Sequence, residues 1–145
     1  MASSGTADNV VPAETRVRVD VRVEQPGEKE RVEALFAGLT TSVEGARVEV
    51  LGGMNRPPMP PSASASLFPL AVAAAEACGY GPLQGVAVGG GSDGNLTAAR
   101  GVSTLDGLGA VGGGAHADHE FVVVDTLVAR ATLLAAIVAA IVAAI

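Results

Sequence analysis

A proline-rich connector divides this chain into two parts of different composition. Residues 52–61 read GGMNRPPMPP, and proline can neither continue a helix nor donate to a central strand. Seven of the nine Lys and Arg residues lie at or before Arg56, and the sequence beyond it is rich in Gly and Ala. The connector and the change in composition predict a boundary after residue 53, with one unit at 1–53 and a second at 54–145.

The first unit has the hydrophobic pattern of a small α/β sandwich. Residues 15–24 read TRVRVDVRVE, in which valine alternates with charged residues as in a strand with one buried face. Residues 28–39 place apolar side chains at helical spacing, which predicts an amphipathic helix. Residues 46–51 alternate again, so the order strand, helix, strand is expected.

The second unit is predicted to contain further helices and short strands. A helix should end near Cys78, followed by a strand at 84–88, helical turns at 93–100, a strand at 121–124 and a final helix from Asp125 or Thr126. Together the two units predict the α/β class. Cys78 lies in an apolar run, so a buried, inert thiol is expected.

The C-terminal run ATLLAAIVAAIVAAI raises the question of a membrane. It extends for 15 residues from Ala131, whereas a bilayer-spanning helix needs roughly 20. We therefore expect a helix that is buried or covered by a partner, and not a membrane span. A membrane-associating helix stays open as an alternative, because the run has no polar face.

Charge and cysteine content exclude some classes of function. The formal charge of −6 argues against a nucleic-acid surface, since binding to phosphates requires a basic patch. A single cysteine cannot form an internal disulfide and fits a reducing compartment. The first residues show no basic region followed by an apolar one, so no signal peptide is evident and a cytoplasmic location is expected.

Two segments could carry chemistry. Residues 89–95 read GGGSDGN, and glycines at such a place allow backbone N–H groups to face an anionic ligand. A flexible turn in which Asp93 caps a helix explains the same pattern. His116, in GGGAHADHEF, could be a zinc ligand or an ordinary loop histidine.

Six motifs in order indicate a family. The sequence contains NVVP, VDVR, GGMNRPPM, GGGSDGN, STLDGLG and GGGAHADHEF. This order resembles the zinc-dependent exopeptidases and deacylases that include glutamate carboxypeptidase, acetylornithine deacetylase and succinyl-diaminopimelate desuccinylase. The resemblance implies that residues 1–53 are the second half of a lid and dimerisation domain. It implies that residues 54–145 are the C-terminal part of a catalytic α/β domain that holds two zinc ions.

The resemblance also implies roles for individual residues. His116 corresponds to a zinc ligand, and Asn9 and Arg22 correspond to lid residues that bind the carboxylate of the substrate. Gly90, Gly91 and Ser92 correspond to a loop that lines the substrate pocket. The implied reaction is hydrolysis of the amide bond of an N-acyl amino acid or of a short peptide with a free carboxylate, in an enzyme that forms a homodimer through its lid.

The chain departs from the family pattern in one important respect. It has no histidine before His116 and no pair of adjacent glutamates, so the other metal ligands and the general base have no counterpart, and no catalytic residue is assigned. We expect this chain to supply one zinc ligand and to be inactive alone. The alternative is a non-catalytic remnant or engineered module that associates with itself.

Overall fold

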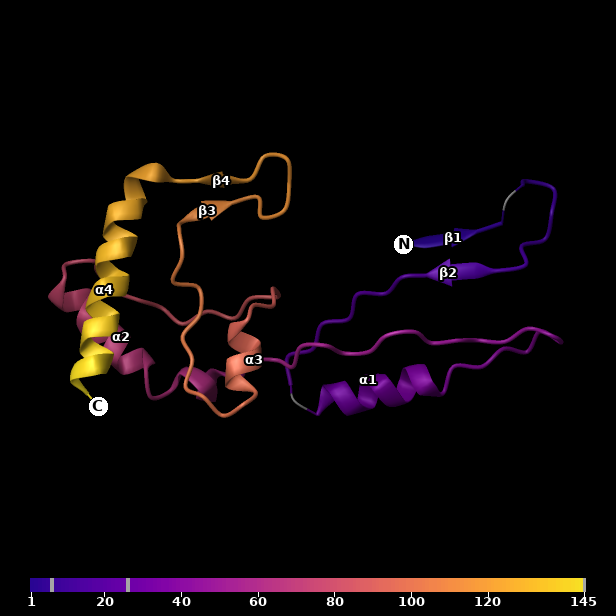
Figure 1. The fold of residues 1–145 in the computed structure, drawn as a ribbon, viewed down its shortest axis with the longest axis horizontal. Coiled ribbons are helices and arrows are strands. Elements are labelled where there is room, and N and C mark those ends of the chain that lie inside the picture. Colours follow the sequence, from indigo (N-terminus) through magenta and orange to yellow (C-terminus); the bar gives the residue numbers. More distant parts are fainter. Residues whose placement is uncertain (6, 26, 145) are drawn as a thin grey trace.

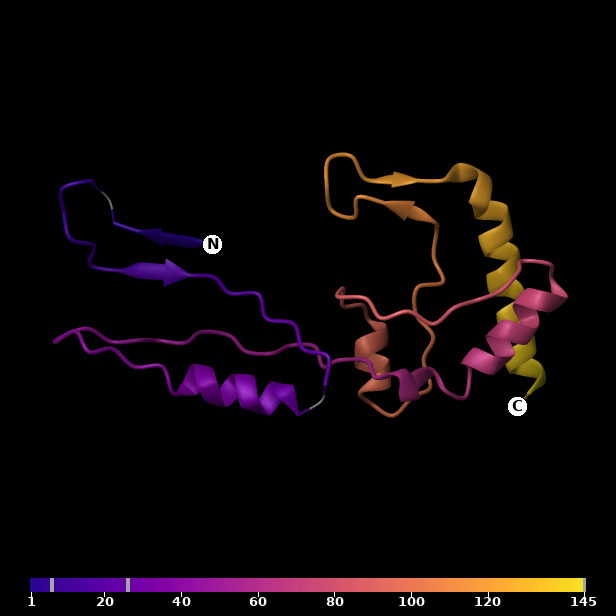
Figure 2. The same ribbon diagram turned by 180° about the vertical axis from the view of Figure 1, so that it is seen from behind.

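The chain forms an elongated molecule with helices and strands at both ends. The computed structural model describes residues 1–5, 7–25 and 27–144. Strands β1 (Ala2–Ser4) and β2 (Thr15–Val17) and helix α1 (Glu28–Ala37) lie at one end. Helices α2 (Phe68–Ala77), α3 (Gly94–Ala98) and α4 (Leu127–Ala143) lie at the other, and the view from behind shows the same separation (Figures 1 and 2). The mixture of helices and strands fits the predicted α/β class.

The paired strands of the first unit are shorter than the sequence predicts. β1 and β2 are antiparallel, with Ala2 opposite Val17 and Ser4 opposite Thr15. The strand expected at 15–24 is therefore reduced to three residues, and the segment expected to form a second strand at 46–51 is irregular. A strand needs a hydrogen-bonding partner along its length, and β1 offers only three residues. The alternating valines predicted the extended backbone but not its pairing.

Helix α1 confirms the prediction of a helix after the first strand, but not a buried apolar face, since none of its residues is buried and Leu35 is 60% exposed. Val32 and Phe36, one turn apart, are half-buried. The helix also has two ion pairs, in which Lys29 donates to Glu33 at 2.7 Å and Arg31 donates to Glu28. The hydrogen bond from Arg31 holds the pKa of the Glu28 carboxyl below its usual value.

The core of the molecule lies between α2 and α4. In the described chain the fully buried apolar residues form one cluster, with Leu133 and Ile137 on α4 and three alanines on α2: Ala71, Ala74 and Ala75. The two α4 residues are four positions apart and therefore share a face. Alanines on α2 allow the two helices to approach closely, so the larger side chains of α4 fill the space between them.

The boundaries of α2 follow from two local features. Pro69 stands in the first turn, where its missing N–H would have had no helical partner. The helix ends before Gly79, whose φ of +71° is the left-handed conformation that favours glycine. The amides of Gly79 and Tyr80 donate to the carbonyls of Glu76 and Ala75 and so close the last turn.

The predicted strands of the second unit are mostly absent from the described structure. Residues 84–88 are irregular, and the strand expected at 121–124 is reduced to β4 (Phe121–Val122). β4 pairs antiparallel with β3 (Gly112–Gly113). The two 3₁₀ turns, η1 (Pro61–Ser64) and η2 (Val124–Thr126), precede α2 and α4.

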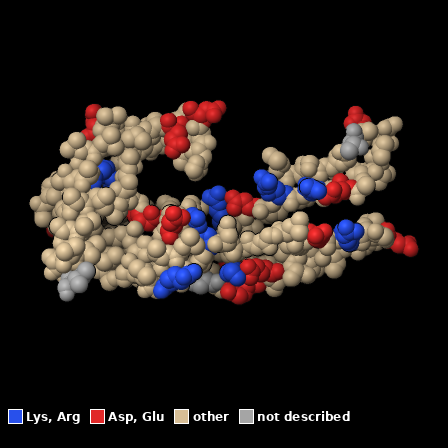
Figure 3. Space-filling view, viewed as in Figure 1, with Lys and Arg blue, Asp and Glu red and all other residues tan. Residues whose placement is uncertain are grey.

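Helix α4 is longer than the apolar run suggested. With η2 it forms a continuous helical segment, Val124–Ala143, of 20 residues and mean hydropathy 2.2, which is long and apolar enough to cross a membrane. The argument from a short run was therefore wrong. The helix expected to be buried is mostly exposed in this chain: only 11% of the segment is buried, where α4 packs against α2 through Leu133 and Ile137. Figure 3 shows few charged side chains on this part of the molecule, in contrast to the part formed by β1, β2 and α1.

Two adjacent leucines on α4 test the position of the core. Leu133 is 1% exposed and Leu134 is 45% exposed. We expect Leu133→Ala to lower the free energy of unfolding in urea by about 2–5 kcal/mol, because it leaves a cavity against α2. Leu134→Ala, the matched control, should cost less than about 1 kcal/mol. Equal losses would show that the contact between α2 and α4 does not dominate stability.

Candidate functional site: the glycine loop and the His116 hairpin

The glycine loop 89–95 is tied to the proline-rich connector by one side chain. Asn95 accepts a hydrogen bond from the Ser92 amide at 2.9 Å, and its Nδ2 donates to the carbonyl of Pro57 at 2.9 Å. Asn95 is half-buried, so water competes less strongly for these two hydrogen bonds. The side chain of Asn95 therefore holds the loop against a segment almost 40 residues earlier in the sequence.

A second contact between the same two segments involves charge. Arg56 in the connector forms an ion pair with Asp93 at 3.3 Å. A Cβ atom at Gly91 would lie only 3.1 Å from Cδ of Arg56, so this glycine allows the arginine side chain to cross the loop closely. Asp93 makes no side-chain cap hydrogen bond to α3, which overturns the interpretation of Asp93 as a helix cap.

Ser92 links the loop to the STLDGLG segment. Its Oγ donates to Asp106 Oδ2 at 2.5 Å and accepts from the Gly94 amide at 3.0 Å. A hydrogen bond from a hydroxyl to a carboxylate is charge-assisted, and it fixes the orientation of the Ser92 side chain. Three residues, Asn95, Arg56 and Asp106, thus hold the loop in place.

Arg22 reaches the same loop from the first unit. Its Nη1 donates to the carbonyl of Gly89 at 2.8 Å, and its Nη2 donates to Asp20 at 3.0 Å. Gly89 directly precedes Gly90, Gly91 and Ser92, which were predicted to bind substrate. The structure therefore brings Arg22 next to that loop, across 67 residues of sequence. The guanidinium has five N–H groups, so some remain available for a ligand.

Asn9 lies apart from this group. It is exposed, in the turn between β1 and β2. That turn lies at the end of the molecule remote from α3 in both views (Figures 1 and 2). Within this chain, the two residues predicted to hold a carboxylate are thus not brought together.

His116 lies in a turn of the loop 114–120 that joins β3 to β4. Its φ of +66° is left-handed, a conformation that a residue with a side chain adopts at a cost of order 1 kcal/mol or more. The backbone amide of His116 donates to Glu120 Oε2 at 3.1 Å, which stabilises the turn. The close approach of Phe121 explains the glycines of β3, since a Cβ at Gly112 would overlap the Phe121 carbonyl oxygen.

The described residues do not form a zinc site. Across residues 1–5, 7–25 and 27–144, no three His, Cys, Asp or Glu side chains lie close enough together to hold a metal ion. His116 is exposed, and tight zinc sites in proteins use three or four protein ligands. A single imidazole in solvent does not satisfy this requirement, so the residues present do not fit a zinc ion.

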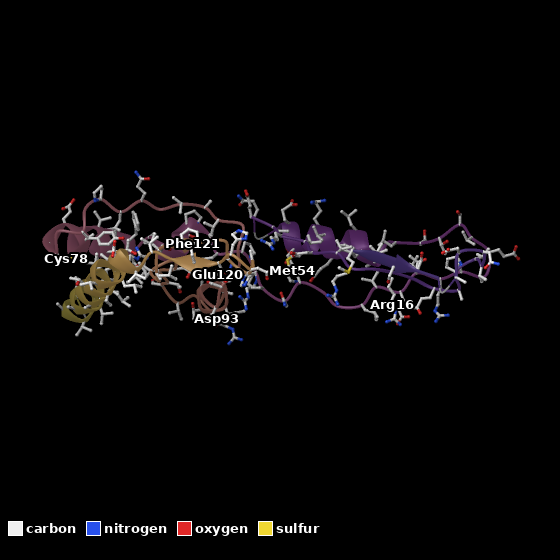
Figure 4. The ribbon with its side chains drawn as sticks, turned by 90° about the horizontal axis from the view of Figure 1, so that it is seen from above. Arg16, Met54, Cys78, Asp93, Glu120 and Phe121 are labelled. Carbon is white, nitrogen blue, oxygen red and sulfur yellow. The ribbon has the colours of Figure 1, made fainter. Side chains whose placement is uncertain are left out.

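The hairpin and the glycine loop nevertheless project towards the same side. In Figures 1 and 2 the β3–β4 turn and the loop before α3 both point towards the part of the molecule that contains β1, β2 and α1. Figure 4, seen from above, shows Glu120 on the hairpin and Asp93 on the loop at similar positions along the long axis of the molecule, whereas Figure 1 shows the hairpin and the loop well separated in the direction of that view. An open apolar face lies elsewhere, on the outer side of α4, and includes Leu134, Val138 and Val142.

Sequence reasoning missed the residues that hold the loop. Arg56 and Asp106 lie within the motifs GGMNRPPM and STLDGLG, and Asn95 closes GGGSDGN. One signal of their importance was present in the sequence, which is that they lie in three successive motifs. Their hydrogen-bonding partners, however, are 14 to 38 residues away in sequence. Nothing in the local pattern specifies such partners.

The comparisons with known proteins support one family. The model of peptidase family M20/M25/M40 matches residues 4–140, which is nearly the whole chain and includes the connector, the glycine loop and the His116 hairpin. No curated protein and no solved structure matches the chain. Members of this family are hydrolases related to metallopeptidases and are generally metal-dependent. The order of the motifs and this match lead to the same conclusion: the chain belongs to peptidase family M20/M25/M40.

Proposed function

We propose that this chain belongs to a zinc hydrolase that cleaves the amide bond of N-acyl amino acids or of short peptides with a free carboxylate. The observation that carries the proposal is the contact of Arg22 with Gly89, at the start of the glycine loop. It supports a carboxylate site between the first unit and that loop. The more specific resemblance, to glutamate carboxypeptidase and the related deacylases, agrees with such a substrate.

In this proposal the chain's own residues bind and orient the substrate. The planar guanidinium of Arg22 presents parallel N–H groups that match a carboxylate. The backbone N–H groups of Gly90 and Gly91 supply neutral donors. The Ser92 amide is bonded to Asn95 and its hydroxyl to Asp106, and these two bonds keep the loop in shape. The acyl amide would then lie on the side towards which the His116 turn projects.

The metal proposed for the complete enzyme is zinc. This chain would supply His116 as one ligand, and the described residues do not supply the others. Zinc in such enzymes lowers the pKa of a bound water. Because the described residues supply no further ligands beside His116, no catalytic step is assigned to this chain by itself. We also propose a cytoplasmic location, in keeping with the single cysteine.

Carboxylate recognition by Arg22 can be tested without a metal. N-acetyl amino acids should shift the NMR amide resonances of Gly90 to Ser92, whereas the matching N-acetyl amino-acid amides should not. Arg22→Gln should weaken this binding roughly tenfold to hundredfold, because a charge-assisted pair is lost. Arg18→Gln, which removes a charge from the same exposed segment, is the control. Binding that is unaffected by Arg22→Gln would contradict the proposed site.

Zinc content tests the role of His116. By atomic emission, the purified chain should retain well under one tightly held zinc ion and should not hydrolyse N-acyl amino acids, since one ligand binds zinc weakly. The weak zinc binding that remains should decrease in His116→Ala and persist in His119→Ala. One or two tightly held ions with turnover would mean that other residues of this chain complete the site.

A second candidate function is supported by the exposed valines of the first unit. In the described part of residues 1–53 no side chain is buried, and Val17 and Val19 are 64% and 56% exposed. Exposed apolar strips of this kind favour association with another chain. They support a homodimer through this unit, either in an enzyme or in a non-catalytic module that associates with itself.

Sedimentation velocity distinguishes a self-associating chain from a monomer. We expect the wild type to dimerise in a concentration-dependent manner and Val19→Lys to shift it to monomer, because a buried charge opposes the contact. Glu24→Lys introduces the same side chain at an exposed position of the segment that is already charged, and should leave the dimer intact. A wild type that stays monomeric at all concentrations, or equal effects of both variants, would exclude this interface.

A further inference from the structure

Arg130 on α4 is a cation whose hydrogen bonds all go to neutral groups. Its Nε donates to the carbonyl of Gly109 and its Nη2 to the carbonyl of Gly107, both at 2.7 Å. Its Nη1 donates to the hydroxyl of Tyr80 at 3.1 Å, and the guanidinium carbon lies 5.8 Å from the centroid of the Tyr80 ring. Among the described residues, no carboxylate lies within ion-pair distance of this side chain.

The two carbonyls belong to the segment that leads into the His116 hairpin. Gly107 has a φ of +72°, so the backbone turns sharply where Arg130 holds it. Two residues after Gly109, the carbonyl of Val111 accepts from the amide of Val123 at 2.8 Å, and β3 begins directly afterwards. Arg130 therefore joins the segment before the hairpin to the helix that follows it, and closes the base of the hairpin.

Arginine suits this task for a geometric reason. Its planar fork can bond two carbonyls two residues apart and a third group at once, whereas lysine is a single point of charge. Tyr80 lies shortly after α2, which ends at Ala77, and is packed against the α2–α4 core. The guanidinium thus connects three parts of the chain: the end of α2, the glycine-rich segment and α4.

We infer that Arg130 is a positioning residue for the hairpin that carries His116. The importance of His116 rests on the proposed function, but the positioning itself is a property of the fold. Arg130 acts through the backbone of Gly107 and Gly109 and does not itself reach the glycine loop or the turn. Without it, the core between α2 and α4 would persist, while the hairpin would lose its fixed direction.

The test compares the hairpin with the core in the same variants. In Arg130→Ala, hydrogen exchange of the Val123 amide should accelerate about tenfold or more, because the base of the hairpin opens. The backbone ¹³C shifts of His116, which report its left-handed φ, should move towards unstructured values. Exchange of the Leu133 and Ile137 amides should change much less. Arg130→Lys should fall between wild type and Arg130→Ala, and added ethylguanidinium should restore the His116 shifts of Arg130→Ala.

The controls separate this role from a general loss of charge or stability. Arg100→Ala removes another arginine of the second unit, whose side chain makes no hydrogen bond in the described chain, and should change none of these signals. The inference is overturned if Arg130→Ala leaves the Val123 and His116 signals unchanged. It is also overturned if they change only in parallel with Leu133 and Ile137.

Two further outcomes are covered by the same design. If Arg130→Ala does not fold, Arg130→Lys carries the comparison. If N-acetyl amino acids fail to bind to the wild type, the proposed function fails, while the exchange and shift measurements still decide the role of Arg130.

Discussion

The packing of α4 on α2 is the contact on which the rest of the described structure depends. Leu133 and Ile137 are the largest fully buried side chains, and they lie against alanines of α2. The glycine-rich segment and the hairpin are attached to this pair of helices through Arg130 and Tyr80. A core this small contributes only a modest hydrophobic term, so polar contacts outside it have a larger share in fixing the loops.

The candidate site likewise depends on polar contacts outside the core. Its loops are irregular, and irregular backbone has many alternative conformations unless side chains restrict it. Asn95, Arg56 and Asp106 provide this restriction for the glycine loop, and Glu120 provides it for the turn around His116. The glycines allow close approach, but these polar side chains select one conformation.

The sequence predicted the helices well and the strands poorly. Helical spacing is local, so the positions of α1 and of the helix that ends at Cys78 follow from a few neighbouring residues. Pairing of 15–24 with 46–51 depends on partners far away in the sequence, and the alternating valines could not specify it. The order of six motifs indicated the family. The same motifs do not supply a group of metal ligands around His116, and the described residues form no such group.

The bridge formed by Asn95 has a consequence for chemical modification. Asn95-Leu96-Thr97 has the acceptor pattern for N-linked glycosylation. The amide nitrogen that would receive the sugar is the one that donates to Pro57, and the hydroxyl of Thr97 is hydrogen-bonded to the carbonyl of Gly94. In the folded chain both groups are engaged in hydrogen bonds, so attachment of a glycan would require the bond from Asn95 to the connector to break and would keep the two segments apart.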